Sequence, residues 1–235
     1  MSRPVLSLRL PAAAHTRLLR AGFREAADAD ADAALAPPPE LGPSALLPPA
    51  RTAAELARQL REQPHVATGL PALDALLGAR GLPTAAVSEL VAHPAAAAAL
   101  CLRLCLATQL PPPAQQPGRP AAVYVDTAGA FSARAAACAA SAIARQLPPA
   151  ARPDPAAMLA RIHVFRAYAA HELIALLASL DRVLRSRPDV GLLLVNSVSW
   201  PFLASFPDDV LRRQAMHAEA ARLLAALASR HRIAA

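Results

Sequence analysis

Residues 85–106 read AAVSELV, AHPAAAAA and LCLRLCL, three segments of different character. The first is a short apolar run typical of a buried strand, and the last repeats apolar residues as an amphipathic helix does. The eight residues between them are Ala92, His93, Pro94, Ala95, Ala96, Ala97, Ala98 and Ala99. A strand, an eight-residue loop and a helix in this order have the layout of a phosphate-binding loop.

The eight residues lack the chemistry of such a loop. A phosphate-binding loop needs glycines whose N–H groups turn towards phosphate oxygens, a lysine for the outer phosphates and a hydroxyl group for magnesium. The chain contains no lysine, and residues 95–99 are consecutive alanines, which favour a helix. We therefore expect the helix to begin one turn early, near Pro94. Its N-terminus is then expected to attract an anion weakly, without tight magnesium-dependent nucleotide binding.

Strand and helix patterns alternate along the rest of the chain. Candidate strands cover 121–126, 161–166 and 191–196, and candidate helices cover 131–147, 170–187 and 208–231. This alternation predicts an α/β fold with a mostly parallel central sheet and helices on both faces. We expect residues 87–91 and 191–195 to lie side by side in its centre. Residues 233–235 read as the start of a further strand, which predicts a sheet that is incomplete at the C-terminus.

The residues before this core read as separate pieces. Residues 1–50 predict a small helical module followed by a proline-rich linker, and residues 51–65 contain a linker helix with Leu56 and Leu60 on one face. The core then covers 66–235, interrupted by a proline-rich loop at 111–120.

Composition narrows the class of protein. All 24 basic residues are arginine and the net charge is +7, which fits contact with nucleic acid but also fits GC-biased coding DNA. Cys101, Cys105 and Cys138 form no CxxC pair and predict no disulfide framework. His163 and His171 lie on different predicted elements, so we assign no metal site. No apolar run is long enough to span a membrane, and we expect a soluble intracellular protein.

These segments in this order resemble the core of the RecA-type recombinases, and more closely the eukaryotic recombinase paralogues. Within that group they are most similar to the C paralogue. The resemblance rests on VATGLPALD (66–74), SEL (88–90), VYVDTAGAF (123–131), LLLVN (192–196), WPF (200–202) and ASRHRIA (228–234). It implies a RecA-like P-loop NTPase core with a small N-terminal helical module.

The resemblance also implies a role and a set of ligands. The family activity is ATP-dependent DNA binding and DNA damage sensing in homologous recombination and double-strand break repair. The implied cofactors are ATP and Mg²⁺. The implied partners are DNA, other recombinase paralogues and the recombinase filament, and the implied location is the nucleus.

Carried over residue by residue, the family's chemistry falls on residues that lack it. The loop lysine falls on Ala98, the magnesium hydroxyl on Ala99, the catalytic glutamate on Ala128 and the magnesium-binding aspartate on Asn196. Asparagine lacks the charge that holds a hard cation. Asp126, at the end of its predicted strand, is an accessory candidate: it either orients water or metal, or caps a turn.

Three functions remain open on the sequence. The chain is an ATP-binding recombination factor with impaired or absent hydrolysis, a non-catalytic interaction subunit of a paralogue complex, or a truncated non-functional product. Trp200 and Phe202 fit either a partner pocket or the core, with the core preferred for the tryptophan. Arg212 and Arg213 face DNA or a neighbouring subunit, or else lie on a solvated helix face.

Overall fold

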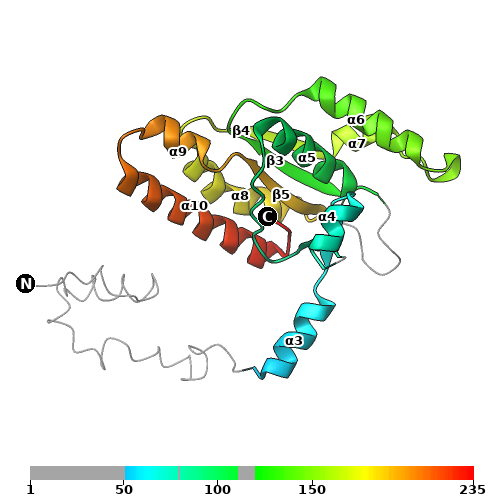
Figure 1. Cartoon of the computed structure of the whole chain (residues 1–235), viewed down its shortest axis with the longest axis horizontal. Coiled ribbons are helices and arrows are strands. Elements are labelled where there is room, and N and C mark those ends of the chain that lie inside the picture. The colour runs from blue at the N-terminus through cyan, green and yellow to red at the C-terminus, as the bar shows by residue number, and fades with distance from the viewer. Residues whose placement is uncertain (1–50, 79, 111–119) are drawn as a thin grey trace, which may run out of the picture. The chain divides into compact units, whose positions relative to one another are not determined.

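The computed structural model describes residues 51–78, 80–110 and 120–235 (Figure 1). The chain divides into two units, residues 1–60 and 61–235, and each is described by itself. The predicted N-terminal module and nearly all of the proline-rich loop lie outside the described residues. The predicted linker helix is present as α3 (Ala53–Glu62). The Thr52 hydroxyl accepts from the Glu55 N–H at 3.2 Å, and the Glu55 carboxylate accepts from the Thr52 N–H at 2.8 Å, so the two residues cap its start reciprocally.

A parallel sheet of three strands lies at the centre of residues 61–235. Its order is β4–β3–β5, with β3 (Ala121–Asp126) between β4 (Ile162–Arg166) and β5 (Val190–Asn196). Each strand lies within one residue of its prediction. The expected α/β fold with a parallel central sheet is therefore confirmed.

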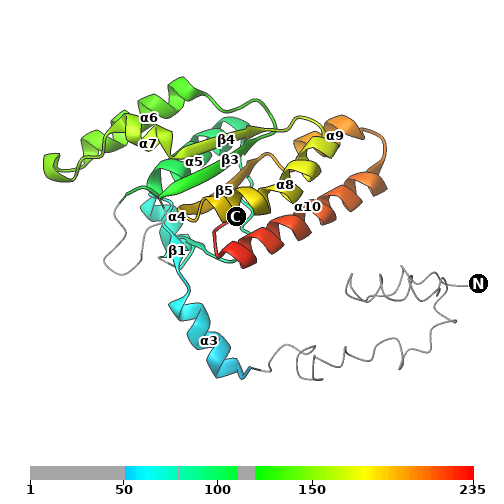
Figure 2. The same cartoon turned by 180° about the vertical axis from the view of Figure 1, so that it is seen from behind.

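Helices cover both faces of the sheet (Figures 1 and 2). All six residues of β3 are buried, because its side chains alternate between two apolar cores. Val123 and Val125 point into the first core and Ala122 and Tyr124 into the second. The first core is closed by α8 (Ala170–Ser186), α9 (Trp200–Ser205) and α10 (Val210–His231). The second is closed by α5 (Pro94–Ala107), α6 (Ala133–Gln146) and α7 (Pro155–Ala160).

A small antiparallel pair precedes α5. Strand β1 (His65–Val66) pairs with β2 (Leu82–Pro83), and α4 (Pro71–Leu76) lies between them in sequence. Gly81 makes this pairing possible: its φ is +87°, and a Cβ there would lie 2.2 Å from the Val66 carbonyl oxygen. The sequence did not predict this pair.

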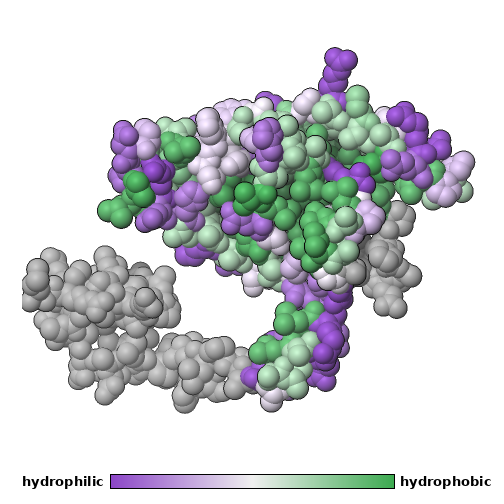
Figure 3. Space-filling view, in the orientation of Figure 1, coloured by the Kyte–Doolittle hydropathy of each residue, from purple (hydrophilic) through white to green (hydrophobic). Residues whose placement is uncertain are grey.

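The apolar run at 85–91 is not the central strand that we expected. Only Ala86 forms a bridge, and it pairs with Ala234, which in turn pairs with Leu192 of β5. Residues 233–235 therefore lie between β5 and the apolar run, and the expectation that the run lies beside 191–195 was wrong. Its side chains remain in part outside the core, since Val91 is 92% exposed. Figure 3 shows hydrophobic residues gathered near the middle of the face that it draws.

Two short helices, α7 and α9, and a 3-10 turn at Pro149–Ala151 occupy segments for which the sequence predicted no helix. Asp154 caps α7 and a proline occupies its first turn, a start signal that could have been recognised. Phe202 is fully buried, but Trp200 is 52% exposed, so the core assignment of the tryptophan was wrong. None of the helices among the described residues combines the length and apolarity that a membrane span needs.

Candidate functional site

The candidate site lies where the strands of the parallel sheet end. Ligands of open α/β sheets bind outside the carboxyl ends of the strands. Asp126 ends β3 and Asn196 ends β5, and the two residues are direct neighbours in the sheet register. In Figure 1, α5 begins near this end of the sheet. The structure therefore brings together two of the residues that the sequence singled out.

The Asp126 carboxylate is fully buried and already bonded. One oxygen accepts from the N–H of Ala130 at 2.9 Å and the other from the N–H of Phe131 at 3.2 Å. Both bonds close the turn that leads from β3 towards α6. Of the two roles left open for Asp126, the structure therefore supports the turn cap.

Asn196 is engaged inside the sheet. Its side-chain Nδ2 donates to the phenolic oxygen of Tyr124 at 2.7 Å, and it is 8% exposed. Burial raises the pKa of Tyr124, and the hydrogen bond from Asn196 opposes that rise. The ring of Phe131 meets the Tyr124 ring edge to face at 5.1 Å. The amide therefore completes a buried cluster, and its Nδ2 is unavailable to a ligand.

The turn after β3 carries the position of the family's catalytic glutamate. Thr127 is buried, its N–H donates to the Asn196 carbonyl at 2.9 Å and its hydroxyl donates to the Ser197 carbonyl. Ala128 and Gly129 follow and are exposed. Ala128 thus stands at an accessible position, but its methyl group can neither accept a proton nor orient water.

Helix α5 begins at Pro94, which confirms the early start expected from the alanine run. Of residues 92–99, only Ala92 and His93 lie outside the helix, and both are exposed. The first helical bond, from the Ala97 N–H to the His93 carbonyl, measures 2.9 Å. The backbone from Ala97 onwards therefore bonds within the helix, and no eight-residue loop surrounds a phosphate.

ATP and Mg²⁺ do not fit the residues at this end of the sheet. A bound nucleotide needs a cation for its outer phosphates and an oxygen ligand for magnesium. Ala98 and Ala99 offer neither, the carboxylate of Asp126 is bonded to the backbone, and Asn196 has a neutral amide that lacks the charge of the family's aspartate. What the arrangement retains is the exposed start of α5, whose free N–H groups attract an anion only weakly.

The other candidate residues, among them Arg212 and Arg213, make contacts that stabilise the fold. The Arg213 guanidinium donates to the Phe206 carbonyl at 2.6 Å, and Arg212 stacks over the Phe206 ring at 4.1 Å, so both arginines fasten the turn before α10. Within the described ranges, no group of three or more His, Cys, Asp or Glu side chains is placed to hold a metal ion. Burial raises the pKa of Cys101 to about 11, as expected for a thiol among leucines.

Tyr124 was not among the residues that the sequence predicted for this site. The signal was its place as the one aromatic residue of the strand AAVYVD, two residues before Asp126 and so on the same face. A tyrosine in a buried strand needs a partner for its hydroxyl group. That partner comes from the neighbouring strand, and only the register of the sheet identifies it as Asn196.

The family model described as Rad51 matches residues 59–235, well over half of the chain. The match covers all three strands of the sheet and both residues that face each other at its carboxyl end.

Proposed function

The chain belongs to the Rad51 family, and on that basis we propose that it is a paralogue-type member, most like the C paralogue, that does not hydrolyse ATP. The family acts in recombination and repair, and its members generally bind DNA, ATP with Mg²⁺ and other recombinase proteins. The proposed role is in homologous recombination and double-strand break repair. In this role the chain acts by binding other molecules and not by hydrolysing ATP. Its proposed location is the nucleus, which is typical of the family.

The bond between Asn196 and Tyr124 carries the proposal that catalysis is lost. A magnesium-binding aspartate at position 196 would present two oxygens at the end of β5. The asparagine instead directs its amide nitrogen into the sheet, where it donates to the phenolic oxygen. The alanines at 98, 99 and 128 support the same conclusion, since each stands where the family resemblance places a reactive group.

Equilibrium binding of labelled ATP to the purified chain, at millimolar magnesium, tests this proposal. We expect no saturable binding. Binding that saturates at micromolar ATP and disappears on addition of EDTA would contradict it. A recombinase of the family with an intact phosphate-binding loop is the positive control, and it must bind ATP in the same buffer.

A second candidate function, a non-catalytic interaction subunit, is favoured by the exposed surface of α9. Trp200 and Leu203 lie one turn apart on this short helix and are 52% and 49% exposed. The Ser205 hydroxyl accepts from the Ala170 N–H at 3.0 Å, which fixes α9 against the start of α8. A rigid helix that presents an aromatic and an aliphatic side chain fits the centre of a protein interface.

Co-elution with other recombinase proteins tests this second function. We expect the chain to co-elute with a full-length recombinase paralogue, and Trp200→Glu together with Leu203→Glu to abolish co-elution. Leu76→Glu is the matched control, because Leu76 is 84% exposed on α4. If the variant with both α9 changes still co-elutes, this surface does not bind the partner.

The domain organisation is part of the proposal. We propose a helical module with its linker at 1–50, a linker helix at 51–65 and a RecA-like ATPase core over 66–235. Limited proteolysis followed by mass spectrometry tests it, and we expect the first cuts before residue 66.

A further inference from the structure

A cavity of about 250 Å³ lies at the opposite end of the sheet from the candidate site. It is formed where α8 and α10 end and β5 begins. Its apolar wall includes Leu184, Val190 and Ile233. Its polar wall is entirely basic and consists of Arg185, Arg187, Arg230 and His231.

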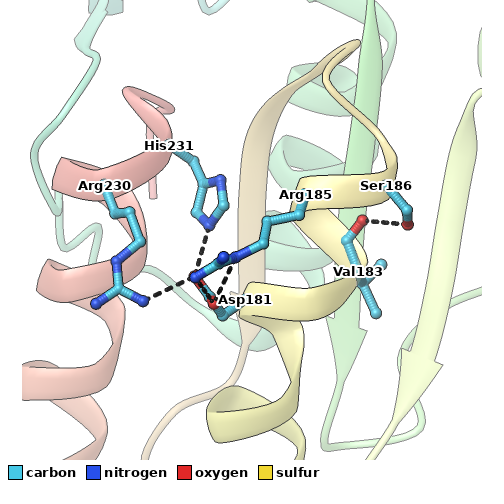
Figure 4. Close-up of polar contacts among 6 residues, drawn as sticks. All are labelled: Asp181, Val183, Arg185, Ser186, Arg230 and His231. Carbon is cyan, nitrogen blue, oxygen red and sulfur yellow. Dashed lines mark hydrogen bonds and ion pairs between the residues drawn. The ribbon is translucent and has the colours of Figure 1, made fainter.

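One carboxylate beside the cavity accepts hydrogen bonds from three of these basic groups (Figure 4). Asp181 accepts from Arg185 at 2.9 Å, from Arg230 at 2.9 Å and from the His231 Nε2 at 3.0 Å. These contacts join α8 to the end of α10. The arginine side chains are nevertheless 67% and 60% exposed, and each guanidinium carries five N–H donors. Donors therefore remain free for a further acceptor.

Arg187 has a different environment. Its Nη1 lies 3.3 Å from the Nε2 of His163, and no carboxylate of the described residues lies within ion-pair distance of it. Partial burial, followed by the charge of Arg187, lowers the pKa of His163 and so favours the neutral imidazole. A neutral imidazole positions the guanidinium without cancelling its charge.

The charges around the cavity leave a positive surplus. Three arginines line the cavity, and two of them, Arg185 and Arg230, pair with the carboxylate of Asp181, so the arginine charges exceed that carboxylate charge by two. The C-terminal ends of α8 and α10 each contribute roughly half a negative charge, which leaves about one. Asp189, whose charge raises the pKa of His163, does not line the cavity and forms no ion pair with Arg185, Arg187 or Arg230. The apolar wall strengthens attraction to an anion, because it lowers the local dielectric constant.

We propose that this cavity binds a phosphate group through Arg187 and the free N–H groups of Arg185 and Arg230. Planar guanidinium groups bind phosphate oxygens in a bidentate manner. The phosphate belongs either to a nucleic acid backbone or to a small ligand that carries pyrophosphate. The site is separate from the candidate nucleotide site, so the proposal does not depend on the loss of ATP hydrolysis.

Two probes separate these sources. Fluorescence anisotropy with a labelled single-stranded thymidine oligonucleotide measures backbone binding to the full chain, and calorimetry with inorganic pyrophosphate measures binding of a small ligand. Arg187→Gln is the test variant, because Arg187 takes no part in the contacts of Asp181. Arg222→Gln is the matched control. It also removes one positive charge, but Arg222 lies on α10, pairs with Glu219 and does not line the cavity.

We expect Arg187→Gln to weaken binding of at least one probe about tenfold, as loss of one charge-assisted contact does, and Arg222→Gln to change it little. For the oligonucleotide, the slope of log affinity against log salt should fall by about 0.7. Arg187→Lys keeps the charge without the planar guanidinium and should give an intermediate loss, with the fold checked by circular dichroism.

Binding of pyrophosphate alone assigns the cavity to a small ligand. Oligonucleotide binding that pyrophosphate displaces assigns it to a nucleic acid backbone. The proposal is overturned if neither probe binds, or if Arg187→Gln and Arg222→Gln weaken binding equally, since equal loss indicates attraction to the overall positive charge.

Discussion

The Nδ2 of Asn196 lies 2.7 Å from the phenolic oxygen of Tyr124, and this contact joins the ends of two neighbouring strands inside the sheet. The residue that stands at the family's magnesium position thus has a structural role. Stability measurements can detect this role, because a buried hydroxyl group that loses its partner destabilises the fold.

Asn196→Ala and Tyr124→Phe should each lower the free energy of unfolding by about 1 kcal/mol. Urea denaturation followed by circular dichroism measures both values. The double variant should lose clearly less than the sum of the two, because either change alone already breaks the bond. Strict additivity would show that the amide and the phenol do not interact in solution.

Asp126→Ala should destabilise the chain by about 2–3 kcal/mol or more. The carboxylate is buried and accepts from two backbone N–H groups, and hydrogen bonds to charged groups contribute about 1.5–3 kcal/mol. Asp154→Ala is the control: that aspartate caps α7 from an exposed position, and its loss should cost about 1 kcal/mol. An Asp126 variant as stable as the control would contradict the buried turn cap.

Gly81→Ala should destabilise residues 61–235 by several kcal/mol, because the new Cβ would meet the Val66 carbonyl oxygen at 2.2 Å. Gly78→Ala separates steric conflict from backbone strain. Gly78 also has a positive φ, of +76°, but nothing lies within 4 Å of its Cβ position, so only about 1–2 kcal/mol is expected. Thermal unfolding of the two variants measures the difference in stability. Equal losses of stability would show that the backbone around Gly81 shifts to make room for the new Cβ.

Acid unfolding should depend on Asp181. Hydrogen bonds from His231, then from Arg230, lower the pKa of Asp181 from 3.8 to about 2. Because the pKa is lower in the folded state, the stabilisation is present above pH 4 and is lost as the pH falls towards 2. Asp181→Asn should therefore be less stable at neutral pH and should show a flatter loss of stability between about pH 5 and pH 2.

Glu219→Gln is the control for this titration. Glu219 pairs with Arg222 three residues away on α10 and joins no two elements, and the arginine lowers its pKa. Its substitution should shift the acid transition less than Asp181→Asn does. The same shift from both variants would mean that Asp181 does not fasten the end of α10 to α8.

The sequence predicted the regular elements because their signals are local. The leucines of α8 repeat at helical spacing, and 191–196 is a continuous apolar run that ends at Asn196. It failed where pairing between distant residues decides the structure. Nothing local to the run at 85–91 shows that Ala234 separates it from β5. Likewise, Trp200 follows a buried strand, but its position at the start of α9 leaves it exposed.

The candidate site was predictable in part for the same reason. The resemblance located Asn196, the strand pattern placed Asp126 at the end of its strand, and the alanine run predicted the early start of α5. The acceptor for Asn196 lies on another strand, 72 positions away in sequence, and follows only from the register. Sequence therefore located the site, and tertiary structure showed how its polar groups are engaged.

Restoring the family's side chains should not restore nucleotide binding. In a variant with Ala98→Lys, Ala99→Thr and Asn196→Asp, α5 still begins at Pro94, so the backbone N–H groups from residue 97 onwards stay bonded inside the helix and cannot cradle a phosphate. We expect its dissociation constant for ATP with Mg²⁺ to remain above roughly 1 mM by equilibrium binding, an affinity of about 4 kcal/mol.

A second variant supplies the missing backbone geometry. It combines the three changes with Ala95→Gly, Ala96→Gly and Ala97→Gly. Each glycine lowers the stability of the helix by about 1 kcal/mol relative to alanine and so favours an open loop. This variant should bind ATP more tightly than the first, and EDTA should abolish the gain. If the first variant already binds micromolar ATP, the missing side chains alone explain why the natural chain does not bind the nucleotide. In that case the helical start of α5 does not explain the loss of nucleotide binding.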